Sequence, residues 1–381
     1  MAFSVSVCLS GGALGDDPYD PGAWSGSAPA LMAALAARTE VAHGFGLSLP
    51  RARFAALAAP RFSPDREVWR RRVYRSRAYR AALTRRVAAW TPRGEALLQI
   101  GAYADGPSVC PLPVLTYQDG AAATYDQSPF VPEALRRDGR LVAQALAFEA
   151  KVAQGAARVL TTSDWLAREM TRAYGLPDGH AVSVGCGVQQ PVVAAPDDRD
   201  YAAARILFVG KEWERKGGPG LLDAFAAVRA AHPAARLDVV GPPERPQGAD
   251  APGVRWHGFL SRRDPDQAAT LERLFAKACV LALPSRYEPF GIAPIEAMAN
   301  GVPAVVTGAW AMAETVTDGI DGAHVAEGDT GALARVLTDL LGTPDRLEAM
   351  GRAAARSARA HSWDTVAARV VTLAKEAARG A

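Results

Sequence analysis

The chain has 381 residues, a hydrophobic content of 49% and a formal net charge of +3, which fits a globular protein of two domains. No apolar run approaches the roughly 18 residues of a membrane span, and residues 2–7 lack the basic leader of a signal peptide. The four cysteines form no C-x-x-C pair, so we expect buried thiols in a reducing, cytoplasmic compartment rather than a disulfide framework.

The first half of the chain alternates apolar runs with longer amphipathic segments, a rhythm typical of α/β domains. We predict strands at residues 3–10, 96–100, 114–117, 158–162 and 181–184. Helices are expected at 30–38, at 132–154 and after Ser163, a residue type that favours the N-cap position.

Residues 51–93 are strongly basic, with thirteen arginines and no lysine against Asp65 and Glu67, a local net charge of +11. Placed on a helix, one side carries the apolar residues Trp69, Val73, Leu83, Val87 and Trp90. Arg80 intrudes on that apolar side, whereas the other helical arginines point elsewhere, namely Arg70, Arg71, Arg75, Arg77 and Arg85.

Two interpretations of this basic segment stay open. It is a helix that packs on the sheet with a solvated arginine face, or its part at residues 66–90 docks on an anionic membrane surface or holds an anionic acceptor. No nucleic-acid motif accompanies the arginines, so nucleic acid is not an expected partner.

An acidic residue, Asp119, comes directly after the predicted strand at 114–117. Ligands of open α/β sheets bind at the carboxyl ends of the strands, so Asp119 is well placed to face a ligand. The alternative is an ordinary Asp-Gly turn.

Residues 189–203 are rich in Pro, Asp and Ala, lack periodicity and predict a linker between domains at 1–188 and 204–358. In the second domain we predict strands at 205–209, 237–240, 279–283 and 304–307, and a strand followed by a turn within 254–259. Helices are expected at 219–231, 266–277, 292–300 and 311–317, with a final helical segment within 359–381.

A basic pair, Arg215-Lys216, follows the strand that ends before Gly210 and directly precedes a glycine-rich helix start. The two cations would neutralise a diphosphate, and the backbone N–H groups of the helix start would point at it. The segment lacks the spacing of a P-loop. His257 has no partner at metal-ligand spacing and is interpreted as a core or edge residue.

The stretch from Pro284 to Pro303 runs from the end of a buried strand through a turn-rich loop into a short helix. Glu288 lies in the loop and Glu296 about one turn into the helix, on either side of an anion-binding helix start. Carboxylates repel phosphate but accept hydrogen bonds from hydroxyl groups. A ligand with phosphates in the middle and hydroxyls at both ends satisfies this pattern, and a nucleotide sugar is such a ligand.

This stretch, from Glu288-Pro-Phe-Gly to Asn-Gly301-Val-Pro, resembles the E-x7-E signature of the retaining glycosyltransferases of family 4. The resemblance implies the GT-B fold: two Rossmann-like, doubly wound parallel-sheet domains face each other across a cleft, and a C-terminal helix crosses back to the first domain. The sequence around Gly26, Trp-Ser-Gly-Ser, is similar to the first loop of many members. The segment from Gly308 to Glu314 departs from the family's usual Gly-Gly-x-x-Glu.

The resemblance assigns a catalytic role to Asp119, Glu288, Arg215 and Lys216 and donor binding to Gly26, Gly210, Phe290, Gly291, Ile292 and Glu296. It implies a UDP- or GDP-sugar donor, a sugar, lipid-linked or small-molecule acceptor, no cofactor and no metal. We therefore expect a retaining hexosyltransferase, cytoplasmic or peripheral at the inner membrane face. The alternatives are a GT-B nucleotide-sugar epimerase or hydrolase, and a non-catalytic nucleotide-sugar-binding protein.

Overall fold

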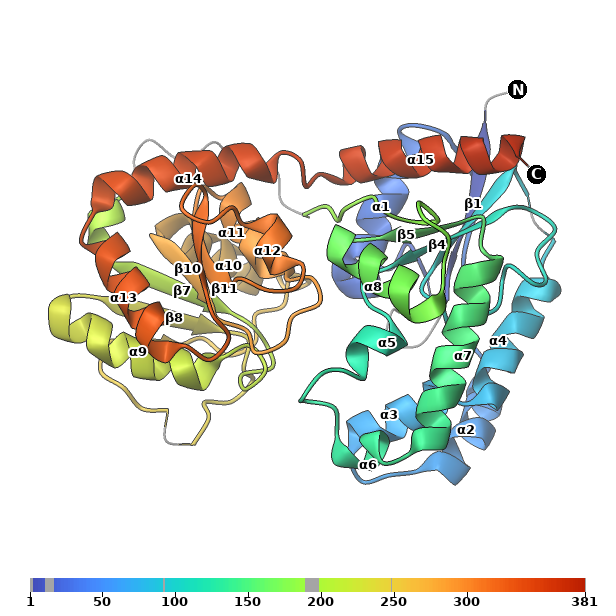
Figure 1. The fold of residues 1–381 in the computed structure, drawn as a ribbon, viewed down its shortest axis with the longest axis horizontal. Helices are drawn as coiled ribbons and strands as arrows, with labels where there is room; N and C mark the ends of the chain where they lie inside the picture. The colour runs from blue at the N-terminus through green and yellow to red at the C-terminus, as the bar shows by residue number, and fades with distance from the viewer. Residues whose placement is uncertain (1–2, 11–16, 92, 189–198, 248, 381) are drawn as a thin grey trace. The chain divides into compact units, whose positions relative to one another are not determined.

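The computed structural model describes residues 3–10, 17–91, 93–188, 199–247 and 249–380 (Figure 1). The chain divides into two compact units: unit 1 comprises residues 1–189 and 363–381, and unit 2 comprises residues 190–362. Each unit contains a six-stranded parallel sheet with helices packed on it, so the predicted α/β class with two doubly wound domains is confirmed. Of the predicted linker, residues 189–198 lie outside the described residues, and Tyr201–Ala203 forms the short 3-10 helix η4.

The sheet of unit 1 has the order β2-β1-β3-β4-β5-β6. Its strands are β1 (Ser4–Leu9), β2 (Glu40–Gly46), β3 (Ala96–Ile100), β4 (Val114–Gln118), β5 (Arg158–Thr161) and β6 (Ala181–Ser183). Strand β2 was not predicted, because its polar residues and two glycines obscure the strand pattern.

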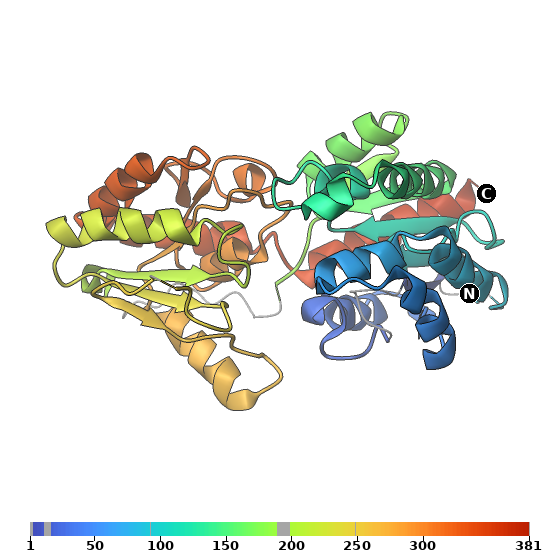
Figure 2. The ribbon, with the colours of Figure 1, turned by 90° about the horizontal axis from the view of Figure 1, so that it is seen from below.

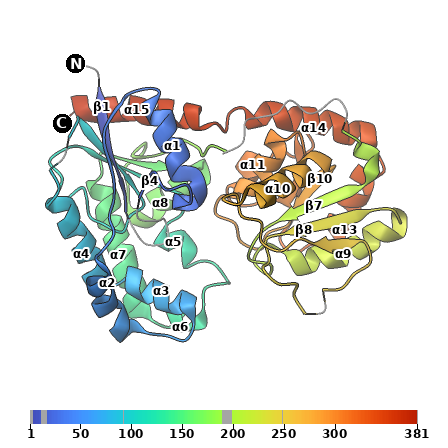
Figure 3. The ribbon, with the colours of Figure 1, turned by 180° about the vertical axis from the view of Figure 1, so that it is seen from behind.

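The helical elements of unit 1 are η2 (Ala23–Gly26), α1 (Ser27–Ala36), α2 (Arg51–Ala58), η3 (Ala59–Arg61), α3 (Arg66–Tyr74), α4 (Arg77–Ala88), α5 (Ala122–Tyr125), α6 (Glu133–Arg136), α7 (Gly139–Gly155), α8 (Asp164–Tyr174) and α15 (Trp363–Arg379). The helix predicted at 132–154 is broken in two, because the Asp138 side chain accepts a hydrogen bond from the Leu141 N–H and so starts a new helix. Helix α15 packs on α1, β3 and β5, as Figure 3 shows for α1, so the last helix belongs to unit 1 as predicted.

The sheet of unit 2 has the order β12-β11-β10-β7-β8-β9. Its strands are β7 (Arg205–Val209), β8 (Arg236–Val240), β9 (Val254–Trp256), β10 (Val280–Leu283), β11 (Ala304–Thr307) and β12 (Gly322–Val325). The strand order reverses between β7 and β10, the central pair of the sheet. Doubly wound sheets bind their ligands in the crevice at such a switch point.

The helices of unit 2 are α9 (Gly218–Ala231), α10 (Pro265–Lys277), α11 (Ile292–Ala299), α12 (Met312–Thr315), α13 (Thr330–Leu341) and α14 (Pro344–Ala358). Helices α9 and α10 lie on opposite sides of the sheet (Figure 2). Over the residues described in both units, no helix is long and apolar enough to cross a membrane.

Candidate functional site

The site in unit 2 is built from the loops that follow β7 and β10, the two strands at the switch point. Strand β10 is buried along its whole length, so its register fixes where the next loop begins. The chain then turns at Gly291, which has a φ of 84° and caps the start of α11. A Cβ there would lie 3.1 Å from Met312 Cγ and 3.3 Å from Glu288 Cγ. Glycine therefore lets the loop backbone lie close to both side chains.

The Glu288 carboxylate is the centre of this site and is only 6% exposed. Its Oε2 atom forms an ion pair with Lys216 Nζ and lies 3.4 Å from Arg215 Nη1. Burial raises the pKa of Glu288, but Lys216, Arg215 and the Phe290 N–H outweigh burial and hold the pKa below its ordinary value. Glu288 is therefore an anion at neutral pH, held between two cations.

Arg215 connects the loop after β7 to the loop after β10 by hydrogen bonds. Its Nη1 donates to the Tyr287 carbonyl at 2.8 Å, its Nε donates to Glu212 Oε2 at 2.7 Å, and its own carbonyl accepts from the Arg286 N–H at 2.8 Å. The cations from one loop and the carboxylate from the other thus form a single rigid cluster.

Glycines let the loops of this edge approach each other closely. Gly217 has a φ of 76° and caps the start of α9, and a Cβ there would collide with the Pro284 carbonyl. A Cβ at Gly241 would come within 2.5 Å of the Gly210 backbone. The N-termini of α9 and α11 therefore open at the same sheet edge, an arrangement that suits phosphate groups.

The second carboxylate, Glu296, lies buried on α11 and is not bonded to the Lys216 cluster. Its Oε1 accepts from Arg262 Nη2 at 2.6 Å. Burial raises the pKa of Glu296 above its ordinary value, and Arg262 only partly opposes that rise. Arg262 was not predicted as a site residue, because it lies far from the motif in the chain and no local pattern marks it.

The candidate residues of unit 1 centre on Trp24. Its Nε1 donates to Asp119 Oδ2 at 2.8 Å, and its ring contacts Tyr117 and Trp363 with centroid separations of 5.1 Å and 6.3 Å. The backbone of Trp24 has a left-handed conformation with a φ of 47°, and the next two residues of η2 also have positive φ angles. Non-glycine residues in this region are strained, and such strain clusters at functional sites. Trp24 was missed as a positioning residue, because its bond to Asp119 joins distant segments.

Gly26 ends this left-handed run with a φ of 88° and caps the start of α1. Glycine adopts this conformation without a steric penalty. Gly26 and Asp119 both lie in unit 1, and the Lys216 cluster lies in unit 2.

The basic segment forms α2, η3, α3 and α4 rather than one helix, because Asp65 and Ser76 accept hydrogen bonds from the first turns of α3 and α4. The predicted apolar contacts are present, with Val73, Leu83 and Val87 in one buried cluster and Trp69 and Trp90 packed against it.

Arg80 is buried, as its place on the apolar side implies, and its Nη1 donates to the Ala145 carbonyl at 3.3 Å. Arg75, expected to point away from the core, is instead buried and paired with Asp126 at 2.8 Å. Arg71 pairs with Glu67 at 2.7 Å and stacks on the Tyr125 ring.

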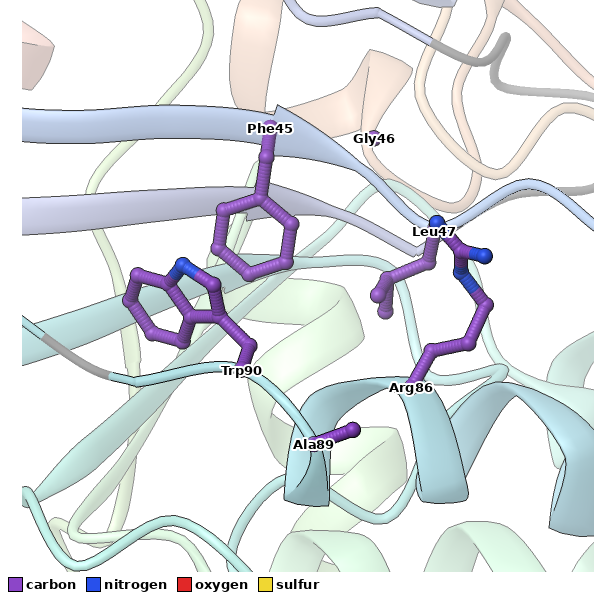
Figure 4. A pocket seen from close by; sticks show the side chains of 6 residues that line it. All are labelled: Phe45, Gly46, Leu47, Arg86, Ala89 and Trp90. Carbon is purple, nitrogen blue, oxygen red and sulfur yellow. The ribbon is translucent and has the colours of Figure 1, made fainter.

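A small pocket of about 370 Å³ lies where the end of β2 meets the end of α4 (Figure 4). Phe45 and Trp90 stand next to each other in it, with ring centroids 4.4 Å apart. Arg86 lines the same pocket. The pocket therefore offers an apolar surface and a cation side by side.

The part of unit 2 that carries this cluster matches a known family. Residues 203–343 match the family model described as glycosyl transferases group 1. This segment is therefore similar to group 1 glycosyltransferase domains. The family resemblance seen in the sequence is confirmed at that level.

Two curated proteins are similar to part of this chain. The D-inositol 3-phosphate glycosyltransferase of Streptomyces avermitilis is 32% identical over 254 residues, which cover 61% of this chain and 55% of that protein. The protein of the same name from Segniliparus rotundus is 29% identical over 261 residues, covering 66% and 57%. The chain thus spans a little more than half the length of these relatives.

Solved structures confirm the GT-B fold over the whole chain. Sucrose-phosphate synthase from Thermosynechococcus elongatus aligns with a TM-score of 0.70 and 19% identity, covering 100% of both chains. HepE from Anabaena, in complex with UDP and glucose, aligns with a TM-score of 0.62 and 15% identity, covering 97% of this chain and 98% of its own.

Proposed function

We propose that the protein transfers a sugar from a nucleoside-diphosphate donor to an acceptor hydroxyl with retention of the anomeric configuration. The observation that carries the proposal is the buried Glu288 carboxylate held by Lys216 and Arg215 at the switch point of a domain similar to group 1 glycosyltransferases. The bond between the anomeric carbon and the diphosphate oxygen breaks and its electron pair leaves with the diphosphate. A bond from the same carbon to the acceptor oxygen forms, and the proton of the acceptor hydroxyl passes to the departing diphosphate.

In this proposal the diphosphate lies at the N-terminus of α9, beside Gly210. Arg215 and Lys216 neutralise the negative charge that grows on the leaving group, and Glu288 accepts a hydrogen bond from a sugar hydroxyl. Two charge-assisted hydrogen bonds that strengthen in the transition state contribute roughly 10²–10⁴ in rate. Because the two cations supply the counter-charge, we propose that the reaction needs no metal, and EDTA is expected to leave the rate unchanged.

The remaining donor contacts follow from α11. The Phe290 N–H donates to Glu288. The Gly291 and Ile292 N–H groups, at the N-terminus of α11, would bind the sugar and the distal phosphate. Arg262 holds Oε1 of Glu296, which leaves Oε2 to accept from ribose hydroxyls.

In unit 1, we propose that Asp119, positioned by Trp24, contacts the sugar near the reacting carbon. Burial raises the pKa of Asp119, and the hydrogen bond from Trp24 opposes that rise. The ionised carboxylate would favour the positive charge that develops there. Gly26 leaves room for the sugar and the acceptor.

The comparisons suggest which compounds to test first. A UDP-sugar is the first donor, since HepE was solved with UDP and glucose. A phosphorylated polyol is the first acceptor, since the curated relatives are named D-inositol 3-phosphate glycosyltransferases, and sugars and lipid-linked acceptors follow.

The proposal is tested by a thermal-shift screen with UDP-, GDP- and ADP-sugars, followed by assays of nucleoside diphosphate release. We expect one donor to raise the melting temperature and to be turned over only when an acceptor is present. Free sugar as the only product would make the protein a hydrolase, and donor binding without turnover in any acceptor screen would make it a binding protein.

We also propose that the surface of α2, α3 and α4 docks on anionic lipid at the inner face of the cytoplasmic membrane. Within the described ranges, seven exposed arginines of this segment form no ion pair, namely Arg51, Arg53, Arg66, Arg77, Arg85, Arg86 and Arg93. Phe62, between η3 and α3, is 73% exposed, and the half-buried Trp90 lines the pocket of Figure 4. Cations beside exposed aromatic rings are typical of surfaces that bind anionic membranes.

Docking is measured by co-sedimentation with vesicles of phosphatidylcholine, with and without phosphatidylserine. We expect binding only with phosphatidylserine, and its loss at high salt and in the triple variant Arg77→Gln/Arg85→Gln/Arg86→Gln. Binding that responds neither to salt nor to the loss of these arginines would contradict docking.

A further inference from the structure

Unit 2 has a second pocket, at the sheet edge where β7, β8 and β9 begin. It encloses about 450 Å³ and is lined by four arginines and one acidic residue, Arg205, Arg229, Arg236, Arg255 and Asp238. All strands of a parallel sheet end at the opposite edge, where Gly210 and Glu288 lie. The two sites are therefore separated by the length of a strand.

The charges in this pocket are not balanced. Arg205 and Arg236 are direct partners in the β7–β8 register, and like charges in that position repel each other. Asp238 lies opposite Arg255, but its Oδ1 bonds His257 Nε2 at 2.7 Å. None of the four arginines forms an ion pair with another described residue. A bound anion would relieve this repulsion.

In one wall of the pocket, Gly253 leaves room for the guanidinium group of Arg229. Gly253 has a φ of 84°, and a Cβ there would overlap Arg229 Nη1. The same nitrogen donates to the Ala235 carbonyl at 3.3 Å, which fixes the Arg229 side chain at the pocket. Arg229 and Arg205 are half-buried, whereas Arg236 and Arg255 are exposed.

We propose that this pocket binds a small polyphosphate anion with two or more linked phosphoryl groups, as a site separate from the donor site. A guanidinium group presents a planar fork of donors that matches phosphate oxygens. Four such groups offer more donors than one phosphate can accept, so linked phosphates fit better than orthophosphate. The pocket volume suits a small anion rather than a macromolecule.

The test is calorimetric titration of inorganic tripolyphosphate into the full chain carrying Arg215→Gln, Lys216→Gln and Glu288→Gln, which removes the cations of the donor site together with the buried carboxylate that they pair with. We expect this parent to bind tripolyphosphate more tightly than orthophosphate. Adding Arg236→Gln and Arg255→Gln is expected to weaken tripolyphosphate binding by at least about tenfold. The matched control, Arg335→Gln on the exposed face of α13, is expected to change the affinity by less than about twofold.

A further variant, Gly253→Ala, keeps every charge but displaces Arg229, and we expect it to weaken binding by several-fold. Thermal melts of each variant establish that the fold is kept, and Arg255→Gln alone serves if the fuller variant is destabilised. The proposal is overturned if Arg236→Gln/Arg255→Gln binds within about twofold of its parent, if Arg335→Gln loses as much affinity, or if orthophosphate binds as tightly as tripolyphosphate.

Discussion

At the scale of single residues, the ion pair between Lys216 and Glu288 determines both stability and proposed activity. Lys216→Met leaves the buried carboxylate with Arg215 alone, and we expect urea denaturation at pH 7 to show a loss of about 2–3 kcal/mol. The double variant Lys216→Met/Glu288→Gln removes the unpaired charge and should recover much of that stability without recovering activity. Equal stability of the single and double variants would contradict this account.

The two carboxylates of the motif should respond to acid in opposite directions. The pKa of Glu288 is lowered in the folded protein, so its stabilising contribution is full above the ordinary glutamate pKa of about 4.3 and is lost as the pH falls through the folded value. The pKa of Glu296 is raised, so its charged form destabilises the fold near neutral pH, and acidification through the folded value removes that penalty.

This difference is measurable as the free energy of unfolding between neutral pH and about pH 3. Glu288→Gln should lose less stability on acidification than the wild type, and Glu296→Gln should lose more. Parallel pH profiles for the two variants would show that the environments of the two carboxylates are wrongly assigned.

At the scale of elements, the close contact between the β7 and β10 loops depends on Gly217. Alanine there brings both left-handed strain and a collision with the Pro284 carbonyl, so we expect a loss of about 3 kcal/mol or more. Gly319→Ala is the matched control, since Gly319 has a φ of 74° with nothing within 4 Å of an added Cβ. It should cost only about 1 kcal/mol in thermal or urea unfolding, and equal costs would show that the loops do not need to touch.

Helix α4 offers a second comparison, between a buried and an exposed arginine. Arg80→Ala removes a guanidinium that packs over the Phe148 ring and bonds backbone carbonyls, and it should destabilise unit 1 by about 3 kcal/mol. Arg85→Ala, on the exposed side, should change the unfolding free energy by less than about 0.5 kcal/mol. Comparable losses would contradict the burial of Arg80.

Local chemistry explains which elements the sequence could predict. The buried run before Pro284 and the glycine at 291 predict a strand, a turn and a helix start, and all three are present. Strand β2 was not predicted, because it is only half-buried and its two glycines are more typical of a loop. The contacts of Trp24 with Asp119 and of Arg262 with Glu296 were also not predicted, because they join segments far apart in the chain.

At the scale of the whole molecule, the last helix is separated in sequence from the unit that it stabilises. Residues 363–381 belong to unit 1, and α15 buries Trp363, Val366 and Val370 there. Truncation after Ser362 should therefore destabilise unit 1 while unit 2 stays folded. Calorimetric unfolding and limited proteolysis distinguish this result from the loss of both units together.

The proposed function requires that the cluster of Lys216, Arg215 and Glu288 binds and activates a nucleotide-sugar donor. The most direct measurement is acceptor-dependent release of nucleoside diphosphate by the wild type, Lys216→Met, and Lys277→Met, which alters an exposed lysine of α10. We expect Lys216→Met to lower kcat/KM by roughly 10²-fold or more and Lys277→Met to leave it unchanged. Wild-type turnover that survives in Lys216→Met at the rate of Lys277→Met would contradict the proposed function.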